Sequence, residues 1–515
     1  MKTVAKTLVD WLRSMGTEVI FGIPGVHTIE LYRALPGAGI RHITPRHEAG
    51  AGFMADGYAR VTGRFGVALV ITGPGLTNIL TPMAQARADS VPMLVISGVN
   101  RRDSIGKGLG HLHELPDQLA LTKALGPAFH LDHPEELPEI LAQIATALTH
   151  GRGGPVHLQI PLDLMAAKAP DAPQPDARPE PLLPDMTGAN RLLDQAAAPV
   201  IIAGGGCRHA GAELLALAER LGAPVILTTN ARGLMHAHPL VVPATPSLGP
   251  VRDLIRSADQ VLVLGSEMGP TDYDIYDDGD VPRVAQMIRI DIDKDQLDRH
   301  PAAFPLQGDV ATILPHLTCS IPANDGPARA EATRKAAYAA LPTGYPDEIA
   351  VLNSLRKSCP GAIMVGDSTQ VIYAGNMYYD HDRPRGWFNA ATGYGALGYA
   401  TGAAVGAALA APDTRILCLI GDGGLMFAPG ELMTAVEENL DITFIVFNNA
   451  GFGEIAEAMK SAGAQVLGCT PRPPAFADFA RAFGLPYTCT MQANLDATAP
   501  GPRMIEVALP PVTTS

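Results

Sequence analysis

One stretch of the chain, residues 415–449, reads RILCLIGDGGLMFAPGELMTAVEENLDITFIVFNN. Apolar runs stand at both of its ends and the residues between them favour a helix, so the stretch predicts a strand–helix–strand unit. The first run ends in Gly421-Asp422-Gly423-Gly424, and the second ends in Asn448-Asn449. Because two parallel strands joined by a helix end at the same edge of a sheet, we expect Asp422 and Asn449 to converge there, where open α/β sheets bind ligands.

The polar residues expected at this edge have the chemistry of a metal-bridged diphosphate site. Magnesium prefers hard oxygen ligands and takes only a few from protein, with the others from phosphate and water. Asp422, the side-chain oxygen of Asn449 and a backbone carbonyl near Gly451 would supply the protein share. The glycines around Asp422 would let backbone N–H groups approach an anion at the start of the following helix. A lone Gly-Asp-Gly is more often a tight turn, and the correctly spaced Asn-Asn is what favours the site.

Apolar strand-like runs alternate with helical stretches along the rest of the chain. This alternation predicts an α/β protein with three doubly wound open-sheet domains. Two Pro-containing polar segments interrupt it and are interpreted as linkers. The expected boundaries are 1–165 for the first domain, 166–188 for a linker, 189–320 for the central domain, 321–345 for a second linker and 346–515 for the third domain. The expected strands include Val19–Phe21, Ile40–Thr44, Val67–Ile71, Met93–Ser97, Pro199–Ile202, Val225–Leu227, Val261–Leu264, Ile288–Ile290, Ala362–Val365, Arg415–Ile420 and Ile442–Phe447.

The composition favours small-molecule chemistry. Hydrophobic residues make up 47% of the 515 residues and charged ones 17%, which suits a large protein with well-buried cores. The formal charge of −14, without a Lys/Arg cluster, argues against binding to nucleic acid or an anionic membrane. The sequence contains no apolar run of the roughly 18 residues that span a bilayer and no signal peptide, so we expect a cytoplasmic protein. The six cysteines lack CxxC spacing and are expected to be reduced, structural thiols.

The chain resembles the thiamine-diphosphate enzyme superfamily, whose signature is Gly-Asp-Gly followed by a helix and a strand ending in Asn-Asn. The resemblance extends over nearly the whole chain and is nearest to the branch of acetolactate synthase, pyruvate oxidase and benzoylformate decarboxylase. In the first domain it rests on FGIPG at 21–25, RHEAGA at 46–51, ADGYAR at 55–60 and TGPGLTN at 72–78. It implies pyrimidine-binding, central and diphosphate-binding domains, and a homodimer or homotetramer with active sites at the subunit interface.

The resemblance also assigns roles to single residues. Glu48 would hydrogen-bond the pyrimidine ring of thiamine diphosphate and promote loss of the reactive thiazolium proton; outside this setting it would be an idle acid at a helix start. Leu397 would prop the cofactor into a bent shape, unless it is an ordinary core leucine. Asp422, Asn449 and the Gly451 carbonyl would bind Mg²⁺. The residues expected to bind the cofactor are Gly25, Thr72, Pro74, Asn78, Gln370, Gly395, Leu397, Gly421, Asp422, Gly423, Gly424, Asn449 and Gly451.

Three further positions have two interpretations each. His113 lies where related enzymes place polar residues above the thiazolium ring, and histidine can carry protons near neutral pH, but a surface-loop histidine explains it equally. Gln370 and Glu454 are either cofactor or substrate contacts or ordinary loop residues.

In the central domain the run AGGGC at 203–207 fails the GxGxxG pattern because position 209 is histidine. FAD-binding acetolactate synthases carry a GMHG-like segment that is missing near 239–254, so FAD is doubtful as a cofactor.

Two regions resemble 5-guanidino-2-oxopentanoate decarboxylases: residues 19–28 with 111–118, and residues 264–274. This resemblance implies decarboxylation of a 2-oxo acid to an aldehyde, with Glu454 as a candidate partner for a substrate guanidinium. One alternative is an acetolactate synthase-type carboligase, which joins the decarboxylated unit to a second carbonyl compound. Another is a non-catalytic regulatory paralogue, and the intact Glu48, Asp422 and Asn449 speak against it.

Overall fold

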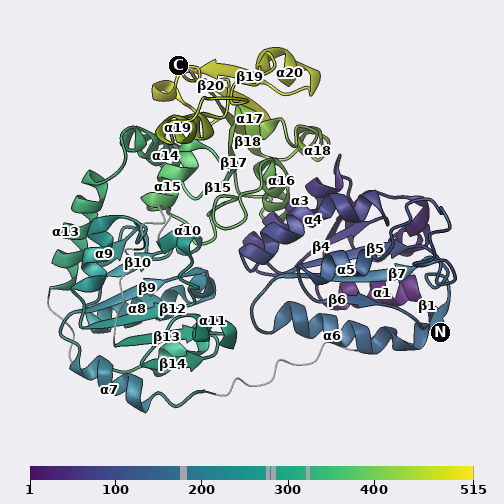
Figure 1. Ribbon diagram of the computed structural model, residues 1–515, viewed down its shortest axis with the longest axis horizontal. Helices are drawn as coiled ribbons and strands as arrows, with labels where there is room; N and C mark the ends of the chain where they lie inside the picture. The colour runs from purple at the N-terminus through teal and green to yellow at the C-terminus, as the bar shows by residue number, and fades with distance from the viewer. Residues whose placement is uncertain (174–182, 274–278, 280–285, 320–324, 514–515) are drawn as a thin grey trace. The chain divides into compact units, whose positions relative to one another are not determined.

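The computed structural model describes residues 1–173, 183–273, 279, 286–319 and 325–513 (Figure 1). The chain divides into two compact units. Unit 1 consists of residues 1–178, 393–489 and 500–515, and unit 2 of residues 179–392 and 490–499. Unit 1 therefore contains the expected first domain and most of the expected third domain, while unit 2 contains the central part of the chain.

Unit 1 begins with a parallel sheet of strand order β3-β2-β4-β5-β7-β6. Helices α1 and α6 pack on one face of this sheet, and α3 and α4 cover the other (Figure 1). Burial on both faces explains why β2, β4 and β5 are nearly continuous apolar runs. The strands are β2 (Val19–Gly22), β3 (Arg41–Ile43), β4 (Gly66–Val70), β5 (Met93–Val99), β6 (Ala128–His130) and β7 (Pro155–Pro161). The helices are α1 (Val4–Ser14), α2 (Ile29–Ala34), α3 (Glu48–Thr62), α4 (Pro74–Ala88), α5 (Gln118–Lys123) and α6 (Leu137–Thr149), with short 3₁₀ helices η1 (Val26–Thr28) and η2 (Pro134–Glu136).

The later part of unit 1 contains the strand–helix–strand stretch from which the fold was predicted. Strands β17 (Ile416–Gly421), β18 (Ile442–Asn448) and β20 (Arg503–Ala508) are parallel neighbours, and Gly421 lies opposite Phe447. The predicted return of the chain to one sheet edge is therefore confirmed. The remaining elements are α16 (Tyr399–Ala410), α17 (Asp422–Leu425), α18 (Glu431–Glu437), α19 (Gly453–Ser461), α20 (Phe476–Ala482) and β19 (Tyr487–Thr490).

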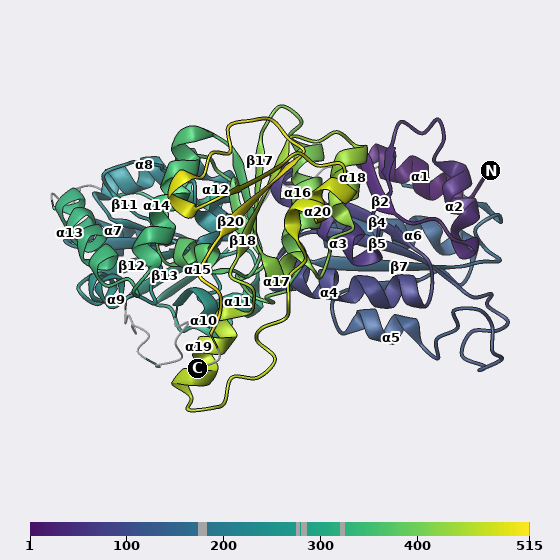
Figure 2. The ribbon, with the colours of Figure 1, turned by 90° about the horizontal axis from the view of Figure 1, so that it is seen from above.

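Helices α3 and α16 pack side by side within unit 1 (Figure 2). A buried polar cluster joins them: Arg60 contacts Asp56 and Asp89, each at 2.6 Å, and the Tyr399 hydroxyl donates to Asp56 at 2.6 Å. The side chain of Arg60 is 9% exposed, and those of Asp56 and Asp89 are 0% and 1% exposed. Burial raises the pKa of Asp56, and Arg60 opposes that rise. The two buried carboxylates therefore share one guanidinium.

Replacing Arg60 by methionine is expected to lower the free energy of unfolding by about 3–5 kcal/mol, because it leaves the fully buried carboxylate of Asp56 without the guanidinium that it contacts. Arg64→Met is the matched control, since Arg64 pairs with Glu18 at 3.0 Å through side chains that are 45% and 55% exposed, and exposed pairs contribute about 0–1 kcal/mol. Urea denaturation of the three proteins measures both values. Equal losses in the two variants would contradict the importance of the buried cluster.

Unit 2 contains a parallel sheet of strand order β11-β10-β9-β12-β13-β14. Its strands are β9 (Pro199–Ala203), β10 (Val225–Leu227), β11 (Val241–Val242), β12 (Gln260–Leu264), β13 (Met287–Asp291) and β14 (Phe304–Gln307). Its helices are α7 (Thr187–Gln195), α8 (Gly211–Leu221), α9 (Gly249–Arg256), α10 (Pro270–Tyr273), α11 (Lys294–Arg299), α12 (Val310–Ile313), α13 (Gly326–Ala339), α14 (Tyr345–Ser358) and α15 (Gln370–Met377), with 3₁₀ helices η3 (Gly205–His209), η4 (Thr229–Ala231) and η5 (Leu314–His316). Strands β15 (Ile363–Gly366) and β16 (Trp387–Asn389) form a parallel pair.

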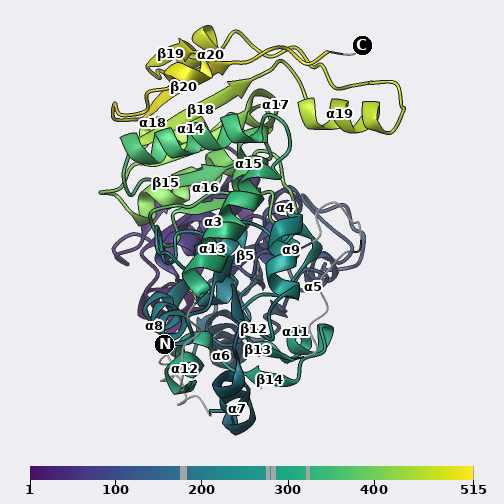
Figure 3. The ribbon, with the colours of Figure 1, turned by 90° about the vertical axis from the view of Figure 1, so that its left-hand side faces the viewer.

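The structure differs from the sequence analysis at the second expected linker, 321–345. Residues 326–339 of that segment form α13, which lies beside α9 in Figure 3, and residues 321–324 are outside the described residues. The buried side of α13 includes Ala330 and Ala337, which join the apolar cluster of the central sheet. Alanine leaves a weak apolar pattern, which is why this helix was missed. Pro327 stands in its first turn, where proline is tolerated.

The first expected linker, 166–188, also contains some regular structure. Lys168–Ala169 form β8, which pairs antiparallel with β1 (Lys2–Thr3). Residues 174–182 of this linker lie outside the described residues, and α7 begins at Thr187. Within the described ranges, no helix combines the length and apolar character that crossing a membrane requires.

Candidate cofactor and active site

The structure brings Asp422, Asn449 and Gly451 together at the carboxyl ends of β17 and β18. Asp422 directly follows β17, is 3% exposed and begins α17. Burial raises the pKa of its carboxyl group, and backbone groups of Asn449, Gly423 and Gly451 oppose that rise by hydrogen bonding. The side chain of Asp422 is thus adjacent to both other predicted metal ligands. This arrangement is what the spacing of the two motifs implied.

The loop after β18 is held in place by later parts of the chain. The N–H of Val512 donates to the carbonyl oxygen of Asn449 at 2.8 Å, and the N–H of Gly451 donates to the Asn449 side-chain oxygen at 3.2 Å. A Cβ atom on Gly451 would lie 2.3 Å from the carbonyl oxygen of Cys469. Only glycine therefore permits this approach. The four-residue α17 directly follows β17 and precedes α18, the helix that contains Glu431.

The donor set at this edge fits a magnesium ion that shares its coordination with a diphosphate. Among the residues that the structure describes, no group of three or more His, Cys, Asp and Glu side chains is placed to hold a metal ion by itself. A single buried carboxylate, one amide and one carbonyl are too few for a complete octahedral shell. They are sufficient where phosphate and water oxygens supply the remaining positions.

Glu48 is the first residue of α3, on the first sheet domain of unit 1. The amide of Asn78 on α4 donates to Glu48 Oε2 at 2.9 Å, so two predicted site residues are in direct contact. A Cβ atom placed on Gly75 would lie 3.6 Å from Glu48 Oε1. The carboxylate therefore lies against the start of α4, beside the segment that contains the predicted cofactor residue Pro74.

His113 lies in the same domain and faces a second histidine, His27. Their ring centroids are 5.4 Å apart, with 33° between the planes. The Nδ1 atoms of both rings are buried and have no hydrogen-bond partner in the described structure. Burial, with a smaller contribution from His113, lowers the pKa of His27. A Cβ atom built on Gly73 would lie 2.7 Å from the carbonyl oxygen of His113. The loop at the end of β4 is therefore packed closely against the backbone of His113.

His27 was not among the predicted site residues. It lies on η1, shortly after β2, at the edge of the sheet where β4 also ends. The available signal was its position, because side chains just beyond the carboxyl ends of parallel strands line the ligand crevice of open sheets. It was overlooked because histidine in a short loop has no distinctive spacing.

The predicted cofactor residue Thr72 points into the domain. Its side chain is fully buried, and its hydroxyl donates to Gln118 Oε1 at 2.7 Å. Gln118 donates in turn to Ser97 Oγ at 3.3 Å, and Ser97 shares a 2.8 Å hydrogen bond with His157 Nε2. Thr122 contacts the other ring nitrogen of His157 at 2.8 Å. A buried polar chain therefore runs from the loop beside His113 across the sheet.

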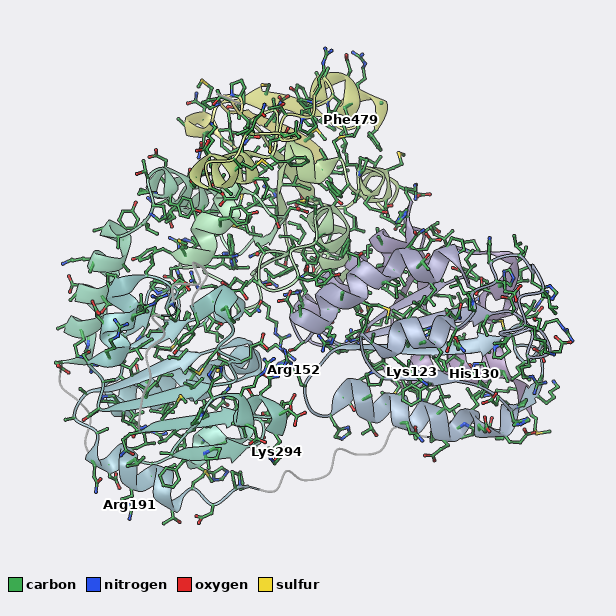
Figure 4. The ribbon with its side chains drawn as sticks, viewed as in Figure 1. Lys123, His130, Arg152, Arg191, Lys294 and Phe479 are labelled. Carbon is green, nitrogen blue, oxygen red and sulfur yellow. The ribbon has the colours of Figure 1, made fainter. Side chains whose placement is uncertain are left out.

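His157 is a titratable group that the structure buries completely. It is 0% exposed, and burial lowers its pKa to about 3, with a smaller contribution from His130. His130, labelled in Figure 4, accepts a hydrogen bond from the Gln159 amide at 2.7 Å. His157 is therefore neutral in the folded protein across the physiological range. Its two ring nitrogens are both occupied by hydroxyl groups.

This depressed pKa predicts a loss of stability in acid. Above pH 6.5 both folded and unfolded states hold His157 neutral; as the pH falls from 6.5 toward 3, only the unfolded state takes up the proton. The free energy of unfolding should then fall by about 1.4 kcal/mol per pH unit from this residue. Urea denaturation of the parent and His157→Gln at pH 7.0, 5.5 and 4.5 should show the gap between them shrinking. Parallel pH dependences would contradict the prediction.

The other predicted site residues have varied positions. Gly25 caps η1 and Pro74 begins α4, both beside the loops described above. Gly395 has a positive φ of 76°, and Leu397 is half-buried before α16. Gln370 is the first residue of α15 in unit 2, and Glu454 is an exposed residue of α19 in unit 1. Asp274, the last residue of one subgroup segment, lies outside the described residues.

The glycine-rich run of the central domain ends in a buried thiol. After β9 the chain forms η3, and Cys207 within it is 0% exposed and donates its Sγ hydrogen to the Leu264 carbonyl at 3.3 Å. Burial raises the pKa of this thiol to about 12. The six cysteines form no disulfide: four of them are buried, while Cys319 is half-buried and Cys489 is exposed.

Three family models match successive parts of the chain. The N-terminal TPP binding domain of thiamine pyrophosphate enzymes matches residues 2–121, the central domain of these enzymes matches residues 186–317, and their C-terminal TPP binding domain matches residues 367–506. Together with the parallel sheets, these matches confirm the predicted architecture of three open-sheet α/β domains. They also support thiamine diphosphate as the cofactor that the chain binds.

The chain is similar over most of its length to curated proteins. It is 42% identical to a probable 2-ketoarginine decarboxylase of Pseudomonas aeruginosa, over 94% of this chain and 88% of that protein. It is 31% identical to the acetolactate synthase isozyme 1 large subunit of Escherichia coli, over 98% and 94%. It is 32% identical to the acetolactate synthase large subunit of Corynebacterium glutamicum, over 88% and 76%.

Proposed function

Because the chain belongs to the thiamine pyrophosphate enzyme family, we propose that it is a thiamine-diphosphate- and Mg²⁺-dependent decarboxylase that converts a 2-oxo acid to an aldehyde. The observation that carries the proposal is the 42% identity with the probable 2-ketoarginine decarboxylase, over 94% of the chain. The name 2-ketoarginine denotes 5-guanidino-2-oxopentanoate, the substrate class that the sequence motifs implied. This compound is the first substrate to test.

In the proposed enzyme, Asp422, Asn449 and the Gly451 carbonyl hold Mg²⁺, which anchors the diphosphate. When bound, thiamine diphosphate supplies a carbon nucleophile that stores the electron pair released by decarboxylation. Glu48 holds a proton against the pyrimidine ring, and Asn78 keeps that carboxylate in place through the 2.9 Å hydrogen bond. Leu397 contributes apolar surface against the cofactor, and Thr72 acts through its buried hydrogen bonds rather than by direct contact.

His113 and His27 are the groups proposed to handle protons at the substrate. Forming an aldehyde requires a proton at the carbon that loses CO₂, and histidine is suited to deliver one near neutral pH. The His27 ring lies beside that of His113, with the ring centroids 5.4 Å apart. A carboligase would instead need space at that carbon for a second carbonyl compound.

The active site is proposed to form between subunits of a homodimer or homotetramer. Glu48 lies on the first domain and Asp422 on the third, and the family resemblance pairs these domains across subunits. Under this proposal, the exposed apolar side chains beside the site become buried on assembly. Val26 is 60% and Phe427 is 61% exposed in the single chain. A monomeric active enzyme in sedimentation analysis would contradict the proposal.

Acetolactate synthase-type carboligation is the second candidate, and the 31–32% identity with two acetolactate synthases favours it. The deciding experiment incubates the purified protein with thiamine diphosphate, Mg²⁺ and either 5-guanidino-2-oxopentanoate, pyruvate or an aromatic 2-oxo acid. Aldehyde and acyloin products are quantified separately. Aldehyde as the main product supports the decarboxylase, and acetolactate supports the carboligase. Absence of turnover on every 2-oxo acid would favour a non-catalytic regulatory paralogue.

If the guanidino substrate is the one decarboxylated, an acidic partner for its cation is required. Glu454 is our candidate, because it is exposed in the first turn of α19, which begins shortly after the loop of Asn449 and Gly451. Glu454→Gln should raise the KM for 5-guanidino-2-oxopentanoate by at least tenfold and leave that for pyruvate unchanged, since a hydrogen bond between charged groups contributes about 1.5–3 kcal/mol. An unchanged KM for the guanidino substrate would reject this residue.

A further inference from the structure

Glu431, on α18, is buried against the peptide that immediately precedes Glu48. Its Oε1 atom accepts hydrogen bonds from the backbone N–H groups of Arg46 at 3.1 Å and His47 at 3.2 Å. Its Oε2 atom accepts the hydroxyl hydrogen of Thr434 at 2.9 Å. The residue is 1% exposed. A carboxylate of the third domain therefore fixes the start of the helix that carries Glu48.

The local sequence is adapted to this contact. A Cβ atom on Gly50 would lie 2.1 Å from Glu431 Oε1, so only glycine leaves room for the carboxylate. The carboxylate also lies at the N-terminal end of the 15-residue α3, where negative charge is favourable. Burying a carboxylate costs free energy unless it is fully hydrogen-bonded. A group that costs so much to bury is consistent with a specific function.

We propose that Glu431 is a positioning residue that fixes the backbone of Glu48 and thereby the direction of its carboxylate. Asn78 holds the carboxylate of Glu48 by a hydrogen bond. Glu431 holds the backbone just before Glu48, because it accepts hydrogen bonds from the N–H groups of Arg46 and His47. Without Glu431, the two N–H groups would lose their acceptor and the first turn of α3 would move. This inference rests on the catalytic role of Glu48 in the proposed function.

The test measures the step that Glu48 is proposed to promote, exchange of the thiazolium C2 proton of enzyme-bound thiamine diphosphate in D₂O. The assay requires no substrate, so it is independent of which 2-oxo acid is decarboxylated. Glu431→Leu should slow exchange by about 10–100-fold, because small misplacements of a reacting group have effects of this size. Glu431→Gln retains one acceptor oxygen and should slow it less. The KM for substrate and the affinity for thiamine diphosphate should stay within about threefold, a margin well under 1.4 kcal/mol.

Glu437→Leu is the matched control. Glu437 lies on the same helix and also contacts Arg46, but it binds the side chain at 2.6 Å and is 56% exposed. The control should exchange at the parent rate. A folded Glu431→Leu protein with the parent rate would overturn the inference; if that variant does not fold, a parent rate in Glu431→Gln would overturn it. A parent enzyme that exchanges the proton but decarboxylates no 2-oxo acid would contradict the proposed function alone.

Unit 2 contains a cavity that is the basis of a second proposal. The cavity has a volume of about 240 Å³ and lies between α13, α14 and the segments 237–243 and 378–380. One face of α14 lines it with Ile349, Asn353 and Arg356, which are spaced at i, i+4 and i+7. The volume corresponds to about eight water molecules at roughly 30 Å³ each. It can therefore hold a small organic acid.

Two arginines, Arg334 and Arg356, and one carboxylate, that of Asp380, line the cavity. Arg356 is half-buried, its buried Nη1 has no hydrogen-bond partner among the described residues, and its guanidinium carbon lies 5.7 Å from the centre of the Tyr379 ring. Arg334 is fixed in place because one of its nitrogens donates to the carbonyls of Pro239 at 2.8 Å and Val241 at 2.7 Å. Asp380 contacts His236 Nδ1 at 2.9 Å and accepts a hydrogen bond from the N–H of Ala237 at 3.0 Å, both through Oδ2, while its buried Oδ1 has no hydrogen-bond partner among the described residues.

We propose that this cavity binds a small organic carboxylate. The guanidinium of Arg356 matches a carboxylate as a two-pronged donor, and the amide of Asn353 lies one turn away on the same helix face. Apolar wall residues, among them Ile349 and Pro243, favour a ligand with a hydrocarbon part over inorganic phosphate. Nothing in the proposed decarboxylation uses these residues, so the site is separate from the catalytic one.

Calorimetric titration of the holoenzyme with malonate tests this proposal, and phosphate is the competing probe. The parent and Lys357→Met should bind malonate alike, since Lys357 is an exposed cation next to Arg356. Arg356→Met should bind it at least tenfold more weakly, as expected for losing hydrogen bonds to a charged group. Absent binding, tighter binding of phosphate, or equal weakening in the control would each overturn the proposal. If Arg356→Met does not fold, unweakened binding in Asn353→Leu would overturn it.

Discussion

Replacing Glu48 by glutamine is expected to lower kcat by about 10²–10⁴-fold, the usual contribution of a positioned proton-transfer group. Glutamine preserves the size of the side chain and can still accept the hydrogen bond from Asn78. The variant therefore removes the exchangeable proton without removing the contact. Thermal stability and the affinity for thiamine diphosphate should change little, while exchange of the C2 proton of the bound cofactor should slow in parallel with kcat.

Glu30→Gln is a suitable control for this prediction. Glu30 lies on α2 of the same domain, where it pairs with Arg33 on the surface at 3.1 Å. Its loss should leave kcat at the parent value, because exposed pairs contribute little. A Glu48→Gln enzyme with kcat within about threefold of the parent, a small fraction of the usual contribution, would show that another group carries the proton. It would also remove the basis for the role proposed for Glu431.

The fold was predictable from the sequence where buried strands are continuous apolar runs. The runs at Val67–Ile71, Val261–Leu264 and Ile442–Phe447 lie within one residue of β4, β12 and β18. By contrast, β7 was missed. His157 and Gln159 are polar residues inside it, and their burial depends on partners such as Ser97 and Thr122 that are distant in sequence. No local pattern can reveal such a partner.

In the candidate site, too, some residues were predictable from the sequence and others were not. Asp422 and Asn449 were predictable, because each follows a strand and their spacing sets where the chain returns. The contact between Glu48 and Asn78 joins two segments that the family motifs had already singled out. Glu431 lies between the two apolar runs of residues 415–449, where the sequence predicted a helix and no role for this side chain. Its contact with Arg46 spans 385 positions of sequence, and it depends on how α18 meets the start of α3.

Replacing Asp422 by asparagine is expected to weaken Mg²⁺-dependent binding of thiamine diphosphate by about 100-fold or more. Losing a direct ligand should exceed the roughly 10–100-fold cost of losing a group that only supports a ligand. The same change should leave the protein at least as stable as the parent in the absence of cofactor. Burial raises the pKa of the Asp422 carboxyl group, so its charged form is disfavoured by the folded structure, and a neutral amide of equal size removes that cost.

Opposite effects on stability and on cofactor binding would distinguish a binding residue from a structural one. Titration of intrinsic fluorescence with thiamine diphosphate at saturating Mg²⁺ measures cofactor binding, and urea denaturation of the apoprotein measures stability. Asp413→Asn is the control, because Asp413 is exposed just before β17 and should alter neither. A less stable Asp422→Asn protein with normal cofactor affinity would mean that the carboxylate serves the turn after β17, and the metal would need other ligands.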